Sequence, residues 1–561
     1  MSSRKPHIIE FSHAVVFGAW KAALALIVLL PTTAVAQEVG SCEMGVAYGD
    51  LDANLVDARL FNTGSLFFGS GYEAQYVVPE GSGKSAMYAA GLWVGGKVGG
   101  ELRTAAATYW GEYWPGPLGE DGLPVDPFDC SEHDEIHGVT RDDLREYVET
   151  GTASEDLSDW PHQLGAPVLD GDGVPDNYDL EAGDRPALLG DETAWWVMND
   201  AGNVHERSGT LPLGMEVRVS AFSHAPSSLE NVVDSALAHT TFYSYQLHYR
   251  GSAELTEAYF GFFADPDLGF AGDDHVGTDT TRNMIFVYNG EDEDDYYGIP
   301  PALGFVMLGA PEEVDEDRPL TASVYYSGRL AVGYPDSAEG HYNNLQGRFR
   351  DGVPMTEGSS GYLAEGAETR YMFPGDPVEQ VFWSDENADG LGNRNPPGDR
   401  RMMLASGPFA MQPGETRTFE FAIVFAQGED RLDSIVRLRE AADAVTANAA
   451  ELFTPDATVD VSSESPDRLP ESVQLNIYPN PARDRVHLGY AVPTGAPMRI
   501  EIFDVLGRRM DHFSIPAGGP GKHSMPIDLH GLGTGMYFVR LEQGTRSGWL
   551  HVVSSSFLVV R

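Results

Sequence analysis

The run FEFAIVF at residues 419–425 is followed, after a short turn, by DRLDSIVRLREAADAVTANAAELF at 430–453. The first run is rich in aromatic and β-branched residues, which favour an extended strand. In the second run the apolar residues share one helical face: Leu432, Ile435, Val436, Leu438, Ala442 and Val445. That spacing is typical of an amphipathic helix. We therefore expect a strand at 419–425 and, at 430–453, a helix packed against the sheet.

Strand-like runs also fill the chain in front of this stretch. They are bounded by Gly, Pro, Asn and Asp and include residues 241–245, 258–263, 284–288 and 323–326. Helix signals are few, and apart from 430–453 we expect only a short helix at 142–150. The fold class predicted for this region is mainly β, as a large β-sandwich-like body with one helix near its end.

The segment 454–472, TPDATVDVSSESPDRLPES, is poor in apolar residues and interrupted by prolines. Such a composition is typical of a linker. It separates a β-rich body at 37–453, which the long loops allow to be one unit or two subdomains, from a C-terminal domain at 473–561.

The C-terminal domain opens LNIYPNPARDRVHL (475–488), continues MRIEIFDVLGRRM (498–510) and ends in a run that contains GMYFVRL (535–541). Prolines 479 and 481 remove backbone donors and predict a turn after a short strand. Met498, Ile500 and Ile502 alternate with charged residues, which is the period of a half-buried strand. Several short strands at this spacing predict a small Ig-like β-sandwich.

Taken together and in order, the proline pair, the D-x-L-G turn and the G-x-Y-F-V strand resemble the type A C-terminal sorting domain of Bacteroidota. The residues that carry the resemblance are Tyr478, Pro479, Asn480, Pro481, Gly507, Gly535 and Tyr537. The resemblance implies export by the type IX secretion system, with its translocon and its sortase as partners. It also implies that this domain is removed and that the cargo is released or linked to surface polysaccharide. The alternative is an ordinary terminal sandwich with no sorting role.

The first 36 residues have the layout of a signal peptide. Arg4, Lys5 and Lys21 precede the apolar run 22–30. Small residues before Gln37 predict cleavage between Ala36 and Gln37. The apolar run is too short to span a bilayer, so we expect no integral membrane span in the mature chain. The alternative joins residues 14–30 into one anchor helix around Lys21.

The body also resembles large exported Bacteroidota proteins that carry the same sorting domain. The resemblance rests on NTGSLF (62–67), GLWVGG (91–96), WWVMND (195–200), DPDLG (265–269) and MFPGDP (372–377), which occur in this order. No activity is assigned to that family, so the resemblance implies a location and no chemistry.

Charge excludes some partners. The chain has 85 acidic against 36 basic residues, a formal net charge of −49. Such an acidic surface repels the phosphate backbone of nucleic acids and anionic lipid headgroups. We therefore do not expect nucleic acid as a partner. It favours a salt-rich habitat, where screening removes the self-repulsion of the fold. The five lysines are Lys5, Lys21, Lys84, Lys97 and Lys522.

The two cysteines, Cys42 and Cys130, lie far apart in sequence. In an oxidising periplasm they can form a disulfide across the N-terminal part of the body. The alternative is two separate thiols.

Catalytic motifs are incomplete. The run 81–85, GSGKS, resembles half of a phosphate-binding loop, but Val78 stands where the signature needs glycine, so we expect a polar turn and no nucleotide. His133 and His137 have the spacing of a zinc motif, but Glu135 lies between them at the wrong position and Gly138 follows. We expect loop histidines and no zinc. Without a G-x-S-x-G elbow, no serine hydrolase is predicted.

Calcium is the better chemical signal. Carboxylates at alternating positions among glycines provide the oxygen ligands of a hard cation in a tight loop. Two stretches have this pattern: Asp170, Asp172 and Asp176, which resemble the loops of thrombospondin type 3 repeats, and Asp385, Asn387 and Asp389, which lack the Glu at the twelfth position. A further group in what we expect to be one loop contains Asp265, Asp267 and Asp273. The alternative is acidic surface charge with local Asx turns.

These observations predict a protein that passes through the periplasm and is secreted or held at the cell surface, with a structural or adhesive role. Carbohydrate binding or glycan degradation is the alternative, because Trp93, Trp110 and Trp114, if exposed, would stack against sugar rings. A surface polysaccharide or extracellular glycan is then the expected partner. A protease is the third class considered, and the sequence contains no motif for one.

Overall fold

The structure is a computed structural model that describes most of the chain. The described residues are 39–68, 75–109, 111–126, 128–225, 231–292, 297–314, 318–327, 332–455, 474–478, 485–492, 498–515, 521–529, 531–545 and 548–559. The expected signal peptide with Ala36 and Gln37, nearly all of the expected linker, and Trp110, Pro479, Asn480 and Pro481 lie outside them.

The largest sheet of the body has nine antiparallel strands, in the order β16-β17-β18-β23-β14-β13-β12-β8, with β9 also paired to β12. Their bounds are β8 (Trp114–Pro115), β9 (His137–Thr140), β12 (Glu192–Asn199), β13 (Met215–Ser223), β14 (Thr240–Tyr249), β16 (Asp274–Asp279), β17 (Met284–Asn289), β18 (Ala302–Gly309) and β23 (Thr416–Ala426).

Strand β23 lies inside this sheet and is buried on both faces. Phe421, Ile423 and Phe425 belong to one hydrophobic core, whereas Ala422 and Val424 belong to a second core. Successive side chains of a strand point to opposite faces, so a strand with two buried faces is apolar throughout. This explains the unbroken apolar run at 421–425, which follows the half-buried Glu420.

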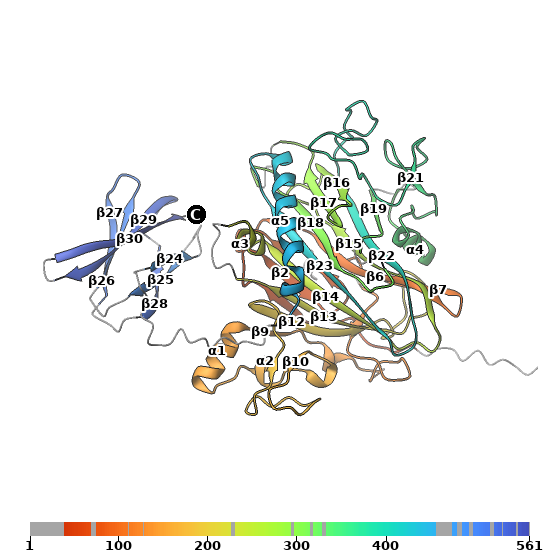
Figure 1. Cartoon of the computed structure of the whole chain (residues 1–561), viewed down its shortest axis with the longest axis horizontal. Coiled ribbons are helices and arrows are strands. Elements are labelled where there is room, and N and C mark those ends of the chain that lie inside the picture. The colour runs from red at the N-terminus through yellow and green to blue at the C-terminus, as the bar shows by residue number, and fades with distance from the viewer. Residues whose placement is uncertain are drawn as a thin grey trace, which may run out of the picture. The chain divides into compact units, whose positions relative to one another are not determined.

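A six-stranded sheet packs on one face of the nine-stranded sheet (Figure 1). Its order is β19-β22-β15-β6-β3, with β7 also paired to β6. The bounds are β3 (Ser65–Leu66), β6 (Ala89–Val98), β7 (Glu101–Ala106), β15 (Leu255–Asp265), β19 (Ala322–Tyr326) and β22 (Arg401–Met411). Phe260 of β15 stacks on Phe419 of β23 with ring centroids 4.4 Å apart. Aromatic pairs of this kind join the two sheets into the predicted sandwich.

Helices cover the other face of the nine-stranded sheet. Figure 1 shows α5 (Arg431–Leu452) lying along β18 and β23, and α3 (Val232–Leu237) lies beside it. The carboxylate of Asp430 caps α5 by accepting from the amides of Leu432 and Asp433. Ile435, Leu438 and Val445 are buried against the sheet. The helix predicted at 430–453 and its packing are confirmed.

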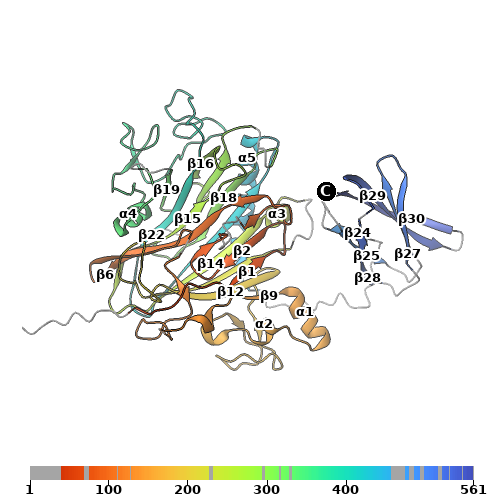
Figure 2. The same cartoon turned by 180° about the vertical axis from the view of Figure 1, so that it is seen from behind.

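The remaining elements of the body are short. Figure 2 shows α1 (Arg141–Thr150) and α2 (Glu155–Ser158) next to β9 and β12, and α1 is the short helix predicted at 142–150. The others are α4 (Ala338–Leu345), η1 (Ser131–His133), η2 (His162–Leu164), β1 (Tyr48–Leu51), β2 (Asp57–Phe61), β4 (Tyr76–Val77), β5 (Ser85–Met87), β10 (Val168–Leu169), β11 (Arg185–Pro186), β20 (Met355–Thr356) and β21 (Glu368–Thr369). Among the described residues, no helix combines the length and the apolar character that a membrane crossing needs.

Two local features of the N-terminal part follow from the sequence. Of the two alternatives for the cysteines, the structure has the disulfide between Cys42 and Cys130, beside buried Trp114. The run 81–85 connects β4 to β5 and is the expected polar turn.

The C-terminal part forms two small antiparallel sheets around its own core. One has the order β24-β25-β28 and the other β27-β26-β29-β30. The bounds are β24 (Gln474–Tyr478), β25 (Arg485–Val492), β26 (Met498–Asp504), β27 (Arg509–Ile515), β28 (Gly521–Asp528), β29 (Gly535–Thr545) and β30 (Gly548–Val559). Gly507 has a φ of +75° in the turn after β26, and the Tyr537 hydroxyl donates to the Gly533 carbonyl. The last strand continues through 554–556, pairing with β29.

Candidate functional site

A group of aspartates gathers where β15 ends and β22 begins. Asp265, the last residue of β15, is fully buried. One carboxylate oxygen each of Asp265, Asp267 and Asp399 lies within 4.8 Å of the others. Asp399 stands two residues before Arg401, the first residue of β22, which pairs with β15. The strand pairing therefore brings together carboxylates that are far apart in the sequence.

Arg401 and two tyrosines hold Asp265 in place. The Nε atom of Arg401 lies 3.0 Å from Oδ1 of Asp265, and the Tyr109 hydroxyl donates to Oδ2 at 2.5 Å. The guanidinium of Arg401 also lies over the ring of Tyr334, 5.2 Å from its centroid, and pairs with Asp399. Burial, and then the charge of Asp267, raise the pKa of Asp265.

Asp274, the first residue of β16, adds a second buried carboxylate. Burial first, and then the charges of Asp267, Asp273 and Asp265, raise its pKa well above the ordinary value. Neither of its carboxylate oxygens makes a hydrogen bond of normal geometry; the amide of Leu268 favours its ionised form. We call Asp265, Asp267, Asp274 and Asp399, with Arg401, the aspartate centre.

The aspartate centre fits a hard cation. Arg401 pairs with Asp265 and Asp399, whereas oxygens of Asp267 and Asp274 lack a hydrogen bond of normal geometry. An ionised buried carboxylate is costly unless it is paired or coordinates a metal. Calcium binds six to eight oxygens, mainly from carboxylates and carbonyls, at about 2.3–2.6 Å. Asp267 and Asp273 lie in the loop between β15 and β16, as expected, whereas Asp265 is the last residue of β15.

The first predicted calcium loop is only partly assembled. Asp170 and Asp172 gather with the buried Asp184, within 4.8 Å, and this group does not include Asp176. Oδ1 of Asp170 accepts from the amides of Asp172 and Gly173, so the loop already has local Asx-type hydrogen bonds. Sequence reasoning missed Asp184, which lies on the far side of the loop.

The second predicted loop uses its carboxylates for hydrogen bonds within the protein. Both oxygens of Asp385 accept, from the Val276 amide and from the Asn395 side chain. Both oxygens of Asp389 accept from donors in residues 391–393. Asn387 donates to the Gln380 carbonyl. A cation here would have to compete with these bonds, and the site stays a prediction.

His137 is not the loop histidine that the sequence indicated. It begins β9, and its side chain is 12% exposed. Its Nε2 lies 3.8 Å from Glu135, and its Nδ1 lies 4.0 Å from Asp156. These three residues form another group with ligand-type atoms within 4.8 Å of one another. The two carboxylates lie nearest to different ring nitrogens, an arrangement that suits ion pairing.

The tryptophans do not form an exposed platform. Trp93 is 1% exposed and Trp114 is 4% exposed. The indole N–H of Trp93 donates to the Ala107 carbonyl, and its ring stacks on Phe263. The expectation that these two rings are exposed for sugar stacking is therefore wrong, because β6 lies inside the six-stranded sheet.

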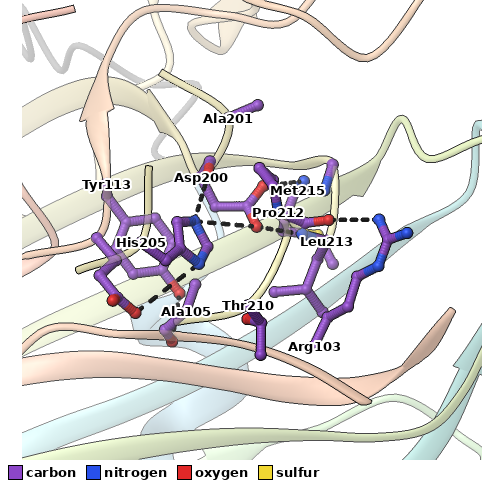
Figure 3. Close-up of polar contacts among 12 residues, drawn as sticks. Arg103, Ala105, Tyr113, Asp200, Ala201, His205, Thr210, Pro212, Leu213 and Met215 are labelled. Atoms are coloured by element: carbon purple, nitrogen blue, oxygen red, sulfur yellow. Dashed lines mark hydrogen bonds and ion pairs between the residues drawn. The ribbon is translucent and has the colours of Figure 1, made fainter. Parts of the chain in front are cut away.

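A buried polar network connects the end of β12 to the following loop. Figure 3 shows the imidazole of His205 beside Asp200. Nδ1 of His205 lies 2.9 Å from the Thr104 carbonyl and Nε2 lies 2.6 Å from the Asp200 carbonyl. Both ring nitrogens therefore face backbone carbonyls, and the carboxylates of Glu112 and Asp200 lie 3.8 and 4.0 Å from the ring.

His205→Leu should therefore destabilise the body strongly. The change removes the contacts of the buried ring with two backbone carbonyls, and leaving buried polar groups without a partner costs about 1–3 kcal/mol. Denaturant unfolding of the variant measures the loss. His512→Leu, at an exposed histidine, serves as the control. Equal stability of the wild type and the His205 variant would show that these contacts do not stabilise the body.

Several residues in or next to the aspartate centre gave no sequence signal. Tyr109, Tyr334, Asp399 and Arg401 stand outside any motif, and only DPDLG at 265–269 marked the region. Their role depends on the pairing of β15 with β22 and of β19 with β22.

Solved structures show only distant similarity to the chain. A polysaccharide lyase is 8% identical over 70% of this chain and 38% of its own, with a TM-score of 0.18. The adhesin domain of Epf from Streptococcus pyogenes is 8% identical over 57% of this chain and 80% of its own, with a TM-score of 0.12. A CARDB domain from Pyrococcus furiosus, in complex with di-metal ions, is 13% identical over 17% and 90%, with a TM-score of 0.13. Scores this low carry no argument about fold or function.

No curated protein is significantly similar to the chain. Residues 476–553 match the family described as secretion system C-terminal sorting domain. The match covers the seven-stranded C-terminal part with Gly507, Gly535 and Tyr537. The chain therefore carries a type IX secretion C-terminal sorting domain and is a secreted or cell-surface protein exported across the outer membrane.

Proposed function

We propose that residues 37–453 act at the cell surface as a structural or adhesive module and that calcium fastens the loops of this module at the aspartate centre. The aspartate centre is the observation that carries this proposal. It brings together carboxylates from the end of β15, the loop after it and the residues just before β22, so an ion there would connect these segments; Asp274 at the start of β16 interacts with them by charge.

Charge supports this role for calcium. The carboxylates of Asp265, Asp267 and Asp399 lie close together and interact with the charge of Asp274, and burial increases the cost of their repulsion because water does not screen them. A divalent cation would remove most of this repulsion. Extracellular modules bind calcium with dissociation constants of about 10⁻⁴–10⁻³ M, which suits a protein outside the cell. The proposed salt-rich habitat would screen the remaining surface charge.

Calcium titration tests the proposal. Chelator-treated protein in high salt should melt at a higher temperature after calcium is added, with a gain of about 2.7 kcal/mol at a hundredfold excess over the dissociation constant. Asp267→Asn, at a half-buried ligand position, should remove most of this gain. Asp142→Asn, at an exposed carboxylate on α1, is the matched control and should keep it.

Two results would contradict the proposed centre. One is an unchanged melting temperature together with no bound metal by elemental analysis. The other is an equal calcium response in the wild type and in Asp267→Asn, which would place the ion elsewhere, for example at Asp170, Asp172 and Asp184.

We also propose the division of the chain into a signal peptide at 1–36, the body at 37–453, a linker at 454–472 and the sorting domain at 473–561. The translocon would recognise the sorting domain, and a sortase would then remove it. The match at 476–553 supports the last boundary.

A carbohydrate-binding or glycan-degrading role is the second candidate. A cavity of about 580 Å³ with an aromatic and polar lining supports it.

A further inference from the structure

One cavity of the body lies between α3, α5 and the end of β23. Its volume is about 580 Å³, within the range of small-molecule sites. Asn231 and Ser235 reach it from α3, Arg437 and Glu440 from α5, and Lys84 from the turn between β4 and β5. We call this cavity the helix pocket. It shares no residue with the aspartate centre.

Aromatic rings form one wall of the helix pocket. Tyr297 and Phe425 lie with ring centroids 5.8 Å apart, and the imidazole of His239 stacks on Phe425 at 6.2 Å. All three residues line the cavity. The apolar face of a sugar ring packs well against such a wall, because aromatic rings present a large, rigid apolar surface.

Lys84 supplies a cation without a carboxylate partner. Its Nζ lies over the ring of Tyr297, 5.4 Å from the centroid, and among the described residues no carboxylate forms an ion pair with it. The Tyr297 hydroxyl donates to the Lys84 carbonyl at 3.1 Å, which holds the turn against the aromatic wall.

The other polar groups of the lining can form hydrogen bonds with the hydroxyl groups of a sugar. Nδ1 of His239 lies 2.8 Å from the Ser235 carbonyl and donates to it, which leaves Nε2 as an acceptor. Burial lowers the pKa of His239, so this ring is neutral near pH 7. Glu440 accepts from Arg437 at 2.9 Å, so this pair offers an acceptor and a donor with little net charge. Among the described lining residues, Lys84 is therefore the cation whose charge no ion pair offsets.

We propose that the helix pocket binds an anionic saccharide, with the carboxylate or sulfate group of the sugar at Lys84 and its ring face against Tyr297 and Phe425. A protein at the cell surface meets such sugars. The inference rests on the proposed function only in assuming this location. Binding does not depend on the aspartate centre, so it should persist in the presence of a chelator.

Saccharide binding in high salt tests the helix pocket. The probes are tri-galacturonate, its fully methyl-esterified counterpart, a sulfated carrageenan oligosaccharide and a neutral cello-oligosaccharide, each measured by calorimetry with and without chelator. We expect at least one anionic sugar to bind and the neutral sugars to bind at least tenfold more weakly. Lys84→Met should weaken anionic binding by about tenfold or more, because it removes a charge-assisted contact.

Lys97→Met is the matched control, since Lys97 lies on β6 and pairs with Glu257. It should bind like the wild type, and both variants should melt like the wild type because each lysine contacts solvent. The proposal is overturned if no anionic sugar binds, if neutral sugars bind as tightly, or if Lys84→Met binds as the wild type does. Loss of binding on chelation would assign the sugar to the aspartate centre and also overturn it.

Discussion

A chain that ends at Phe453 is expected to fold normally and to stay inside the outer membrane, whereas the full chain reaches the cell surface. The reason is that the body and the C-terminal part have separate hydrophobic cores. Both large cores of the body end at or before Leu452, and the core of the C-terminal part begins at Val486. Truncation therefore removes no residue of the cores of the body, but it removes the whole sorting domain at 476–553.

Cell fractionation and surface labelling of the two chains measure export. Nearly all of the full chain and almost none of the truncated chain should be found at the surface. The melting temperature of the purified truncated body is the control, because it separates a failure of export from a failure to fold. Surface exposure of the truncated chain would show that export does not depend on the sorting domain.

Glu386→Gln is expected to cause the largest loss of stability among the single changes considered. Glu386 is 1% exposed and accepts from Nη1 and Nη2 of Arg431 at 2.7 and 3.1 Å. Nδ1 of His275 lies 3.3 Å from the same carboxylate. Removing one partner of a buried pair costs about 3–5 kcal/mol, and Arg431 would keep only its ion pair with the exposed Asp292. Arg431 is the first residue of α5, so the change also loosens the helix from the body.

The same residue predicts how stability changes with pH. Burial acts to raise the pKa of Glu386, but His275 and Arg431 outweigh it and lower the pKa from 4.5 to about 2. A depressed carboxyl pKa stabilises the folded state above the pKa of the unfolded chain. This contribution is fully present above about pH 4.5 and is lost as the pH falls toward 2.

Denaturant unfolding of the wild type and Glu386→Gln between pH 7 and pH 2.5 measures both effects. The difference in unfolding free energy should be largest at pH 7 and shrink below pH 4.5. Glu379→Gln, at an exposed glutamate nearby, should behave like the wild type throughout. A difference that stays constant with pH would show that Glu386 does not act through its charge.

Local patterns were enough to predict the elements of this protein. The aromatic and β-branched run at 419–425, the one-faced apolar spacing at 430–453 and the alternation at 498–502 each appear as the expected strand or helix. Such patterns are reliable because a strand or helix repeats over a few residues, and turn residues such as Gly507 act within the same short range.

The exposure of single side chains was less predictable. Trp93 was expected at the surface and lies in the core, because its position depends on strands β7 and β15 on either side of β6.

By itself, the sequence determined the β-rich class, the helix at 430–453 and the sorting domain, because each depends on patterns of neighbouring residues. Only the tertiary structure decided which acids meet. Asp265 and Asp399 are distant in the chain, and the pairing of β15 with β22 brings their oxygens within 4.8 Å. The helix pocket likewise joins Lys84, Tyr297 and Arg437 across three parts of the chain. Strand register and helix docking set these distances, and both depend on the packing of the whole core rather than on local sequence.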